Sequence, residues 1–242
     1  MTTLLETAET HDVEDRTSAA VARLREVAAS DGWGALEWSR PTPSAAFSRR
    51  DSRGPAFDAA VASVRRRGFV PFIRPVGGRL ACYDEGALVL DVLLRCSHPR
   101  PGTIARFRLF AEAIAVGLRR LGVDARTGAV HGEYCPGEWS VNAGGTAKLA
   151  GTGQRLVRDA ALLTAVIVVG PPEATAEAMT EAYDHLGLEF DPLSVGGVCQ
   201  YVPGVALDDV EESVGGALAD VLQLSAPDLV AGRALLGPWD PR

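Results

Sequence analysis

An unbroken apolar run at residues 161–169, ALLTAVIVV, constrains the fold of this chain more than any other feature. The run is too short to cross a membrane as a helix, and Pro171 and Pro172 end it directly afterwards. An extended segment with apolar side chains on both faces is typical of a strand that is buried on both sides. The sequence therefore predicts that residues 161–169 form a central strand of a sheet.

The remaining periodicities place helices and further strands around this central strand. Apolar residues at helical spacing, closed in several cases by a glycine, predict helices. Their approximate ranges are 21–31, 57–68, 101–122, 176–186 and 207–221. Strand-like runs predict two strands within 35–51, three within 70–94 and the arms of a hairpin at 140–143 and 146–151. This order predicts an α/β (α+β) fold, with a mixed, largely antiparallel sheet flanked by helices.

The chain is expected to form one domain between two tails. Its 242 residues, 47% of them hydrophobic, suffice for one large core. We expect a tail at 1–16, a single domain at 17–224 and a second tail at 225–242. The start, MTTLLETAETHDVED, is acidic where a signal peptide would be basic and then apolar. No apolar run reaches membrane-spanning length, so a cytoplasmic protein without a membrane partner is expected.

Charge and cysteine content argue against two further classes of protein. A formal net charge of −7 disfavours a general nucleic-acid binder, because phosphate neutralisation needs an excess of Lys and Arg. The cysteines form no CxxC pair and no cluster with histidine of the kind that binds zinc. They are Cys82, Cys96, Cys135 and Cys199. Free thiols and no metal site are therefore expected.

A thiol and an amine lie close together in residues 133–155, EYCPGEWSVNAGGTAKLAGTGQR. Lys148 is the sole lysine of the chain and follows the predicted hairpin turn at residues 144–145. Strand alternation places Lys148 and Ala150 on one face of the second arm. Cys135 precedes a Pro-Gly pair, a turn-like context in which a thiol can be exposed.

These two residues suit acyl chemistry, although each has a structural alternative. The compact ammonium of Lys148 can stabilise a developing oxyanion, and the thiol of Cys135 can accept an acyl group. Alternatively, Cys135 is a small buried hydrophobe and Lys148 a solvated strand lysine. Both interpretations remain open at the level of the residues.

A second candidate cradle lies in the glycine turn predicted within 70–94. Arg74 with Gly77 and Gly78 can bind an anion or a carbonyl oxygen, because guanidinium groups and exposed backbone amides both favour oxyanions. The alternative is an ordinary glycine turn with a surface arginine. The arginine run at 65–67 is typical of a solvated helix end, or it docks an acidic partner.

Together the two glycine-containing stretches resemble the lipoate-protein ligase A and octanoyltransferase family, whose fold is related to the biotin protein ligase catalytic domain. The resembling stretches are RPVGGRLACYDEG and GGTAKLAGTGQR, within a region from about Leu36 to Leu188. The resemblance implies an acyl pocket lined by an arginine and glycine motif and a lysine that contacts the acyl carbonyl. The matching residues are Arg74, Gly77, Gly78 and Asp84 in the first motif, and Lys148, Gly151, Thr152 and Gln154, with Asn142 beside them, in the second.

The resemblance also favours one branch of that family. Ligases typically carry a third glycine where this chain has Arg79, and the GGR form is more similar to octanoyltransferases. Some octanoyltransferases use a cysteine upstream of the lysine, which Cys135 matches. The implied reaction takes octanoyl from acyl carrier protein through Cys135 to a lysine of a lipoyl-domain protein, without a cofactor.

Two alternatives stay open. One is an ATP-dependent lipoate-protein ligase that uses free lipoate or octanoate with ATP and Mg and needs no cysteine. The other is a non-catalytic acyl- or cofactor-binding relative. Many family members continue with a glutamine, histidine and glycine sequence after the second motif, whereas this chain continues with DAALLTA.

Overall fold

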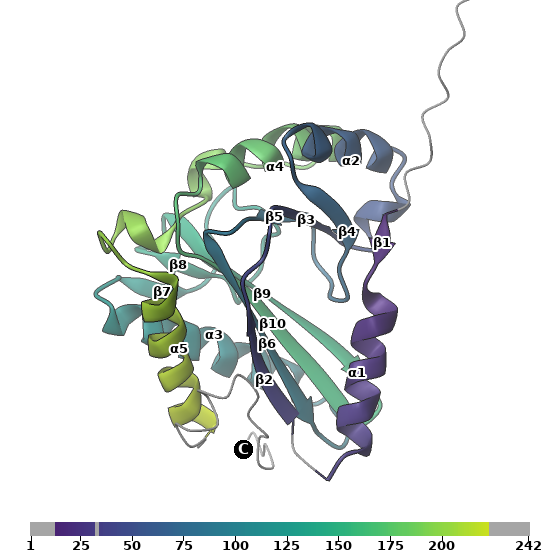
Figure 1. The fold of residues 1–242 in the computed structure, drawn as a ribbon, viewed down its shortest axis with the longest axis vertical. Helices are drawn as coiled ribbons and strands as arrows, with labels where there is room; N and C mark the ends of the chain where they lie inside the picture. The colour runs from purple at the N-terminus through teal and green to yellow at the C-terminus, as the bar shows by residue number, and fades with distance from the viewer. Residues whose placement is uncertain (1–12, 32–33, 223–242) are drawn as a thin grey trace, which may run out of the picture.

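A computed structural model describes residues 13–31 and 34–222 and shows two sheets with helices on their outer faces (Figure 1). The helices are α1 (Thr17–Ala29), α2 (Phe57–Arg66), α3 (Thr103–Arg120), α4 (Glu173–Leu186) and α5 (Leu207–Leu222). The strands are β1 (Glu14–Asp15), β2 (Gly34–Ser39), β3 (Ser44–Phe47), β4 (Val70–Ile73), β5 (Ala81–Tyr83), β6 (Ala87–Arg95), β7 (Ala125–Thr127), β8 (Val141–Ala143), β9 (Ala147–Val157) and β10 (Ala160–Val168). Most of the predicted helices and strands are present near their expected ranges.

The larger sheet confirms the central position of the apolar run. Its order is β2-β6-β10-β9-β8-β7, and every neighbouring pair is antiparallel. On one face of β10, Leu163, Ala165 and Ile167 pack into the main core together with residues of α3 and α5. On the opposite face, Leu162 packs in a separate cluster with residues of α1. The strand is therefore covered on both sides, as its composition predicts.

The smaller sheet, β1-β4-β3-β5, lies across the other face of the larger one (Figure 1). It mixes parallel pairs, β1 with β4 and β3 with β4, with the antiparallel pair of β3 and β5. Helices α2 and α4 cover its outer side, and their apolar faces form a second core with Phe47 and Leu80. The predicted fold class, a mixed and largely antiparallel α/β architecture flanked by helices, is confirmed.

Four details differ from the sequence prediction. Strand β7 was not predicted, and β9 continues well past the expected end of the hairpin arm. The predicted tails at 1–16 and 225–242 fall mainly outside the described residues. The last residues of the first tail are ordered, however: β1 pairs with β4, and the Asp15 carboxylate accepts a hydrogen bond from the amide of Thr17 at the start of α1.

The fourth difference is a β-bulge in the hairpin that carries the lysine. The register between β8 and β9 shifts so that Val141 pairs with Ala150 while Asn142 pairs with Lys148, which leaves Leu149 as an extra residue. Leu149 and Ala150 consequently both pack into the core beneath α3, and simple alternation on this arm is wrong. Bulges re-aim side chains and are frequent beside active sites. Here the bulge directs Lys148 away from the core and into the space between the sheets.

Candidate active site

A cavity of about 810 Å³ lies between the two sheets. Its floor is the face of the larger sheet formed by β6, β9 and β10, and its roof is the smaller sheet together with α1. Eight of the site residues predicted from the sequence line it: Arg74, Gly77, Gly78, Cys135, Lys148, Gly151, Thr152 and Gln154. The fold thus brings both glycine-containing stretches to one cavity.

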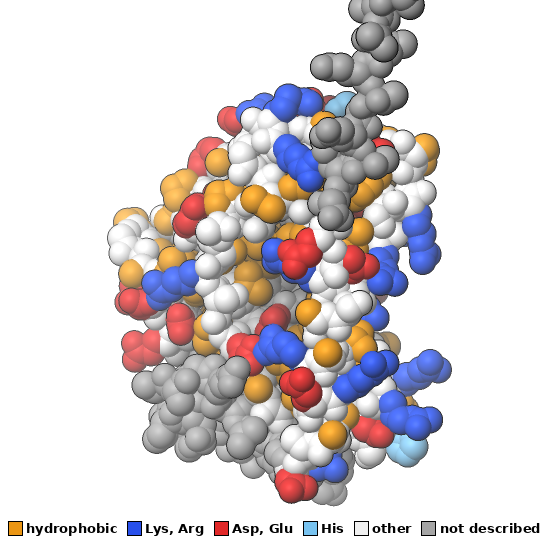
Figure 2. Space-filling view, turned by 45° about the vertical axis from the view of Figure 1, so that its right-hand side comes forward, with side chains coloured by type: hydrophobic (Ala, Val, Ile, Leu, Met, Phe, Trp, Pro, Cys, Tyr) orange, Lys and Arg blue, Asp and Glu red, His pale blue; other side chains and the backbone are white. Residues whose placement is uncertain are grey.

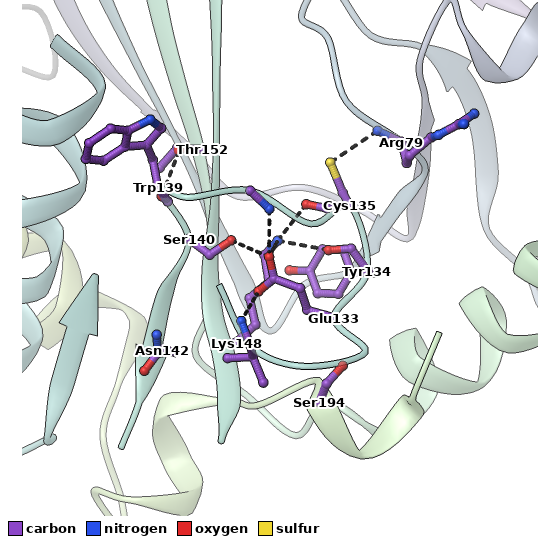
Figure 3. Close-up of polar contacts among 12 residues, drawn as sticks. Arg79, Glu133, Tyr134, Cys135, Trp139, Ser140, Asn142, Lys148, Thr152 and Ser194 are labelled. Atoms are coloured by element: carbon purple, nitrogen blue, oxygen red, sulfur yellow. Dashed lines mark hydrogen bonds and ion pairs between the residues drawn. The ribbon is translucent and has the colours of Figure 1, made fainter. Parts of the chain in front are cut away.

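Cys135 lies in the loop between β7 and β8 in a strained conformation. Its φ of 43° is in the left-handed region, which a residue with a side chain rarely adopts. Two polar contacts hold it there: its amide donates to the hydroxyl of Tyr183 at 2.7 Å, and its carbonyl accepts from Nζ of Lys148 at 3.0 Å. The strained backbone turns the sulfur toward the glycine turn (Figure 3).

The sulfur of Cys135 is surrounded by hydrogen-bond donors. It accepts from Nη2 of Arg74 and from the backbone amide of Arg79, each at 3.2 Å. Burial works to raise the pKa of the Cys135 thiol, but the positive charges of Arg74 and Lys148 and the Arg79 amide outweigh it and leave that pKa lowered. A thiolate favoured in this way is the form that acts as a nucleophile.

We therefore predict that the Cys135 thiol ionises at a lower pH than an ordinary cysteine. The rate at which iodoacetamide alkylates Cys135 is measured by peptide mapping at a series of pH values. The midpoint of this pH dependence should lie at a lower pH than the midpoint for Cys199, whose pKa is raised by burial. Arg74→Met should move the Cys135 midpoint to higher pH, because the nearest positive charge is removed. A midpoint at or above that of Cys199 would contradict the prediction.

Lys148 forms a buried ion pair with Glu133 directly below the cysteine loop. Both side chains are almost fully buried, with 1% and 2% exposure, and Nζ lies 3.5 Å from Oε1 of Glu133. Nζ also donates to the carbonyls of Tyr134 at 2.9 Å and of Cys135 at 3.0 Å (Figure 3). Burial lowers the pKa of Lys148, and the Glu133 carboxylate opposes this shift. The lysine thus anchors the loop that presents the thiol.

The carboxylate of Glu133 is bonded on every side. It accepts hydrogen bonds from the amides of Val130 at 3.1 Å and Gly137 at 2.9 Å, and from the hydroxyl of Ser140 at 2.8 Å. These partners flank Cys135 in sequence, so Glu133 closes the loop upon itself. Glu133 could not be identified from the sequence, because its role depends on Lys148, which lies on β9.

The glycine turn between β4 and β5 contacts the thiol directly. A side chain at Gly78 would meet Cys135 Sγ at 2.5 Å and Nη2 of Arg74 at 2.4 Å, and the φ of this residue is 103°. Only glycine fits these conditions. In the described part of the chain the amides of Gly77 and Gly78 donate to no protein acceptor. Free amides next to a nucleophile have the arrangement of an oxyanion hole.

The remaining predicted residues divide into cavity residues and structural ones. The hydroxyl of Thr152 donates to the carbonyl of Trp139 at 2.9 Å, and Gln154 accepts from buried Arg106. Asn142 and Asp84 do not line the cavity. Asn142 stabilises the hairpin turn, and Asp84 accepts from the amide of Gly86 in the turn before β6.

A second cavity, of about 510 Å³, lies on the other side of the glycine turn and also reaches Cys135. Five arginines line it: Arg49, Arg50, Arg74, Arg79 and Arg155. Two of them pair with aspartates, whereas the other three have no carboxylate partner within the described residues. Figure 2 shows several basic side chains near the right-hand edge of the face drawn, and others at its top and left.

Several contacts of the site could not be inferred from the sequence. Tyr183 of α4 bridges the amide of Cys135 and the carbonyl of Leu80, at 2.7 and 2.8 Å. Its partners lie 48 and 103 residues away, so no local pattern marks it. Arg79 was noted only for departing from the ligase pattern, yet its amide contacts the thiol.

The described residues hold no group of three or more His, Cys, Asp or Glu side chains that could bind a metal ion. In the same part of the chain, every helix is too short or too polar to span a membrane.

The sequence pattern of the lipoyl protein ligase A/B catalytic domain matches residues 54–215, which is well over half of the chain. A relative from Geobacillus kaustophilus, octanoyl-[GcvH]:protein N-octanoyltransferase, is 27% identical over 74% of this chain and 60% of its own length. Octanoyltransferase LipM from Kyrpidia tusciae is 36% identical over 36% of this chain and 31% of its own. The chain thus spans about three fifths of the length of the first of these relatives.

Solved structures show a similar fold. The lipoate-protein ligase A structure bound with ATP has a TM-score of 0.64 at 19% identity, over 87% of this chain and 84% of its own. The protein from T. acidophilum described as a putative lipoate protein ligase with bound lipoic acid has a TM-score of 0.61 at 20% identity, over 84% of this chain and 80% of its own. At 19% and 20% sequence identity, the similarity to these two structures establishes the fold alone.

Proposed function

The chain belongs to the lipoyl protein ligase A/B catalytic-domain family, and from that premise we propose that it is an acyltransferase of lipoate metabolism. It moves an octanoyl or lipoyl group to a lysine of a lipoyl-domain protein through a thioester on Cys135. One observation carries this proposal: Cys135 lines a large cavity, with its sulfur next to Arg74 and beside free amides. A ligase that activates its substrate with ATP does not need such a thiol.

In the first half of the reaction the Cys135 thiolate attacks the carbonyl carbon of the donor thioester. A carbon–sulfur bond forms, and the negative charge moves to the carbonyl oxygen, within reach of the amides of Gly77 and Gly78 and the ammonium of Lys148. Collapse of this intermediate breaks the bond to the donor sulfur, which leaves as a thiolate and takes a proton from solvent. The acyl group is then held by Cys135 with its chain in the cavity.

In the second half the neutral amine of the acceptor lysine attacks the thioester carbon. An amide bond forms, the Cys135 thiolate is expelled, and the proton lost by the amine passes to solvent. The same amides and the same ammonium stabilise the second oxyanion, because the carbonyl carbon stays attached to the same sulfur. The transferase reaction therefore requires no cofactor.

The proposed partners are carrier proteins on both sides of the reaction. The donor is octanoyl-acyl carrier protein, and the name of the G. kaustophilus relative points to octanoyl-GcvH as a further donor. The cavity lined by five arginines favours acidic surfaces near the donor and acceptor groups. We place the reaction in the cytoplasm, with no nucleic acid and no membrane as partner.

The test is the intact mass of the protein after incubation with octanoyl-acyl carrier protein. We expect one octanoyl adduct, mapped to Cys135, that disappears when a lipoyl domain is added and reappears on that domain. Because the chain contains a single lysine, Lys148, the adduct is readily assigned to sulfur. An unmodified protein that nevertheless acylates a lipoyl domain would refute the thioester.

The ligase alternative predicts different requirements. It uses free lipoate or octanoate with ATP and Mg, releases pyrophosphate and holds an acyl adenylate at Lys148. Its supporting observation is the size of the cavity, which exceeds the volume of an eight-carbon chain. Pyrophosphate release that depends on free lipoate identifies this activity, and tight acyl binding without any transfer identifies a non-catalytic relative.

A further inference from the structure

The carboxylate of Asp91 forms part of the floor of the larger cavity, which holds the acyl chain in the proposed reaction. Asp91 of β6 lines the cavity and is half-buried there, on the same face of the sheet as Val89 and the β10 residues Leu162 and Val166. Its cross-strand neighbour on β10 is Thr164, the other polar side chain in this part of the floor. A purely apolar acyl chain does not require either group.

The position of Asp91 relative to the reacting end follows from the strand register. Gly151, which lies against the Lys148 ammonium, pairs with Val166. Val166 in turn pairs with Val89 of β6, and Asp91 is two residues from Val89 along that strand. Asp91 is therefore two strands away from Gly151 across the sheet and two residues away along the strand direction. With about 4.8 Å between strands and about 3.4 Å per residue, the separation is about 12 Å. An extended eight-carbon chain spans roughly 9 Å, so its last carbons reach Asp91 when its carbonyl lies beside Lys148.

Within residues 13–31 and 34–222, Asp91 forms no ion pair of its own. The positive charge of Arg23 on α1 acts on Asp91, but Arg23 forms an ion pair with Glu37 of β2, the cross-strand neighbour of Asp91. Burial raises the pKa of Asp91, and a hydrogen bond with Thr164 opposes that shift. Covering this carboxylate with a methyl terminus would remove its remaining solvent without adding a hydrogen-bond donor to the one that Thr164 supplies.

We infer that the cavity selects an acyl group of about eight carbons that carries a hydroxyl or thiol near its far end, bound by Asp91 and Thr164. A hydroxyl or thiol both donates and accepts hydrogen bonds, which matches a carboxylate beside a threonine. This inference rests on the proposed function for the position of the carbonyl. It deepens that function by naming the end group of the acyl chain.

The test compares two small thioesters of N-acetylcysteamine, one with octanoate and one with 8-hydroxyoctanoate. For the wild type we expect acylation of Cys135 by the hydroxylated chain to have a kcat/KM about tenfold higher or more, since a site built to bond a hydroxyl rejects the analogue that lacks it. Asp91→Leu should reverse this preference. Asp91→Asn, which keeps the shape and one acceptor oxygen, should reduce it only in part.

A matched control removes a carboxylate elsewhere. Asp184→Leu changes an exposed residue of α4 outside the cavity and should leave the preference unchanged. A wild type that prefers octanoyl, or a ratio that Asp91→Leu leaves within twofold, would overturn the inference. If neither thioester acylates the protein, the proposed function fails, and calorimetric binding of the two free acids to the wild type and Asp91→Leu still measures the preference.

Discussion

Replacement of Cys135 by alanine is expected to reduce acyl transfer to a lipoyl domain by about 10⁴-fold or more, because loss of a covalent nucleophile removes the whole two-step route. The protein should stay folded. Contacts that hold this loop run through the backbone of Cys135, whose amide and carbonyl are kept in the variant. The rate is measured as octanoyl-domain formed per enzyme, and folding by thermal unfolding of both proteins.

Two further variants define what the thiol contributes. Cys199→Ala removes a thiol outside both cavities, so full activity is expected. Cys135→Ser keeps the shape but replaces the acidic thiol with a hydroxyl that the positive surroundings cannot ionise at neutral pH, and we expect it to be nearly as inactive as the alanine variant. Activity of Cys135→Ala within tenfold of the wild type would show that the acyl group passes to the acceptor without a cysteine.

Much of the fold could be predicted because periodicity is a local property of the chain. The run at 161–169 identified the central strand, and glycines at helix ends marked boundaries such as Gly122 after α3. The bulge at Leu149 escaped prediction, because strand alternation assumes a regular register and the register here is set by pairing with β8. Strand β7 was missed because three residues carry too little pattern.

The site was predictable only as two separate motifs. Glycines, the lone lysine and the cysteine are visible as residue types, and the resemblance to a family placed them around an acyl group. What joins them is not local: Tyr183 reaches Cys135 from α4, and Glu133 pairs with Lys148, which lies on β9. Asp91 was hidden in a strand that is otherwise apolar, where a single carboxylate does not alter the pattern.

The second large effect is expected at Lys148. Lys148→Met should lower acyl transfer by about 10³-fold, since the ammonium near the oxyanion is lost. It should also lower the free energy of unfolding by about 3–5 kcal/mol, because the variant leaves the Glu133 carboxylate buried without its counter-charge. Chemical denaturation and steady-state transfer measure the two effects separately. Methionine is the appropriate replacement because it keeps the length and packing of the lysine stem.

The double variant Lys148→Met/Glu133→Gln separates the stabilising role of the lysine from its chemical role. It removes both charges of the buried pair, and the glutamine keeps one oxygen to accept hydrogen bonds from the loop, for instance from Ser140. We therefore expect it to recover about half of the stability lost in Lys148→Met but none of the transfer rate. If activity returned together with stability, Lys148 would act only by anchoring the loop, and the amides of Gly77 and Gly78 would be left to stabilise the oxyanion. If the single variant kept wild-type stability, the pair with Glu133 would not hold the cysteine loop in place.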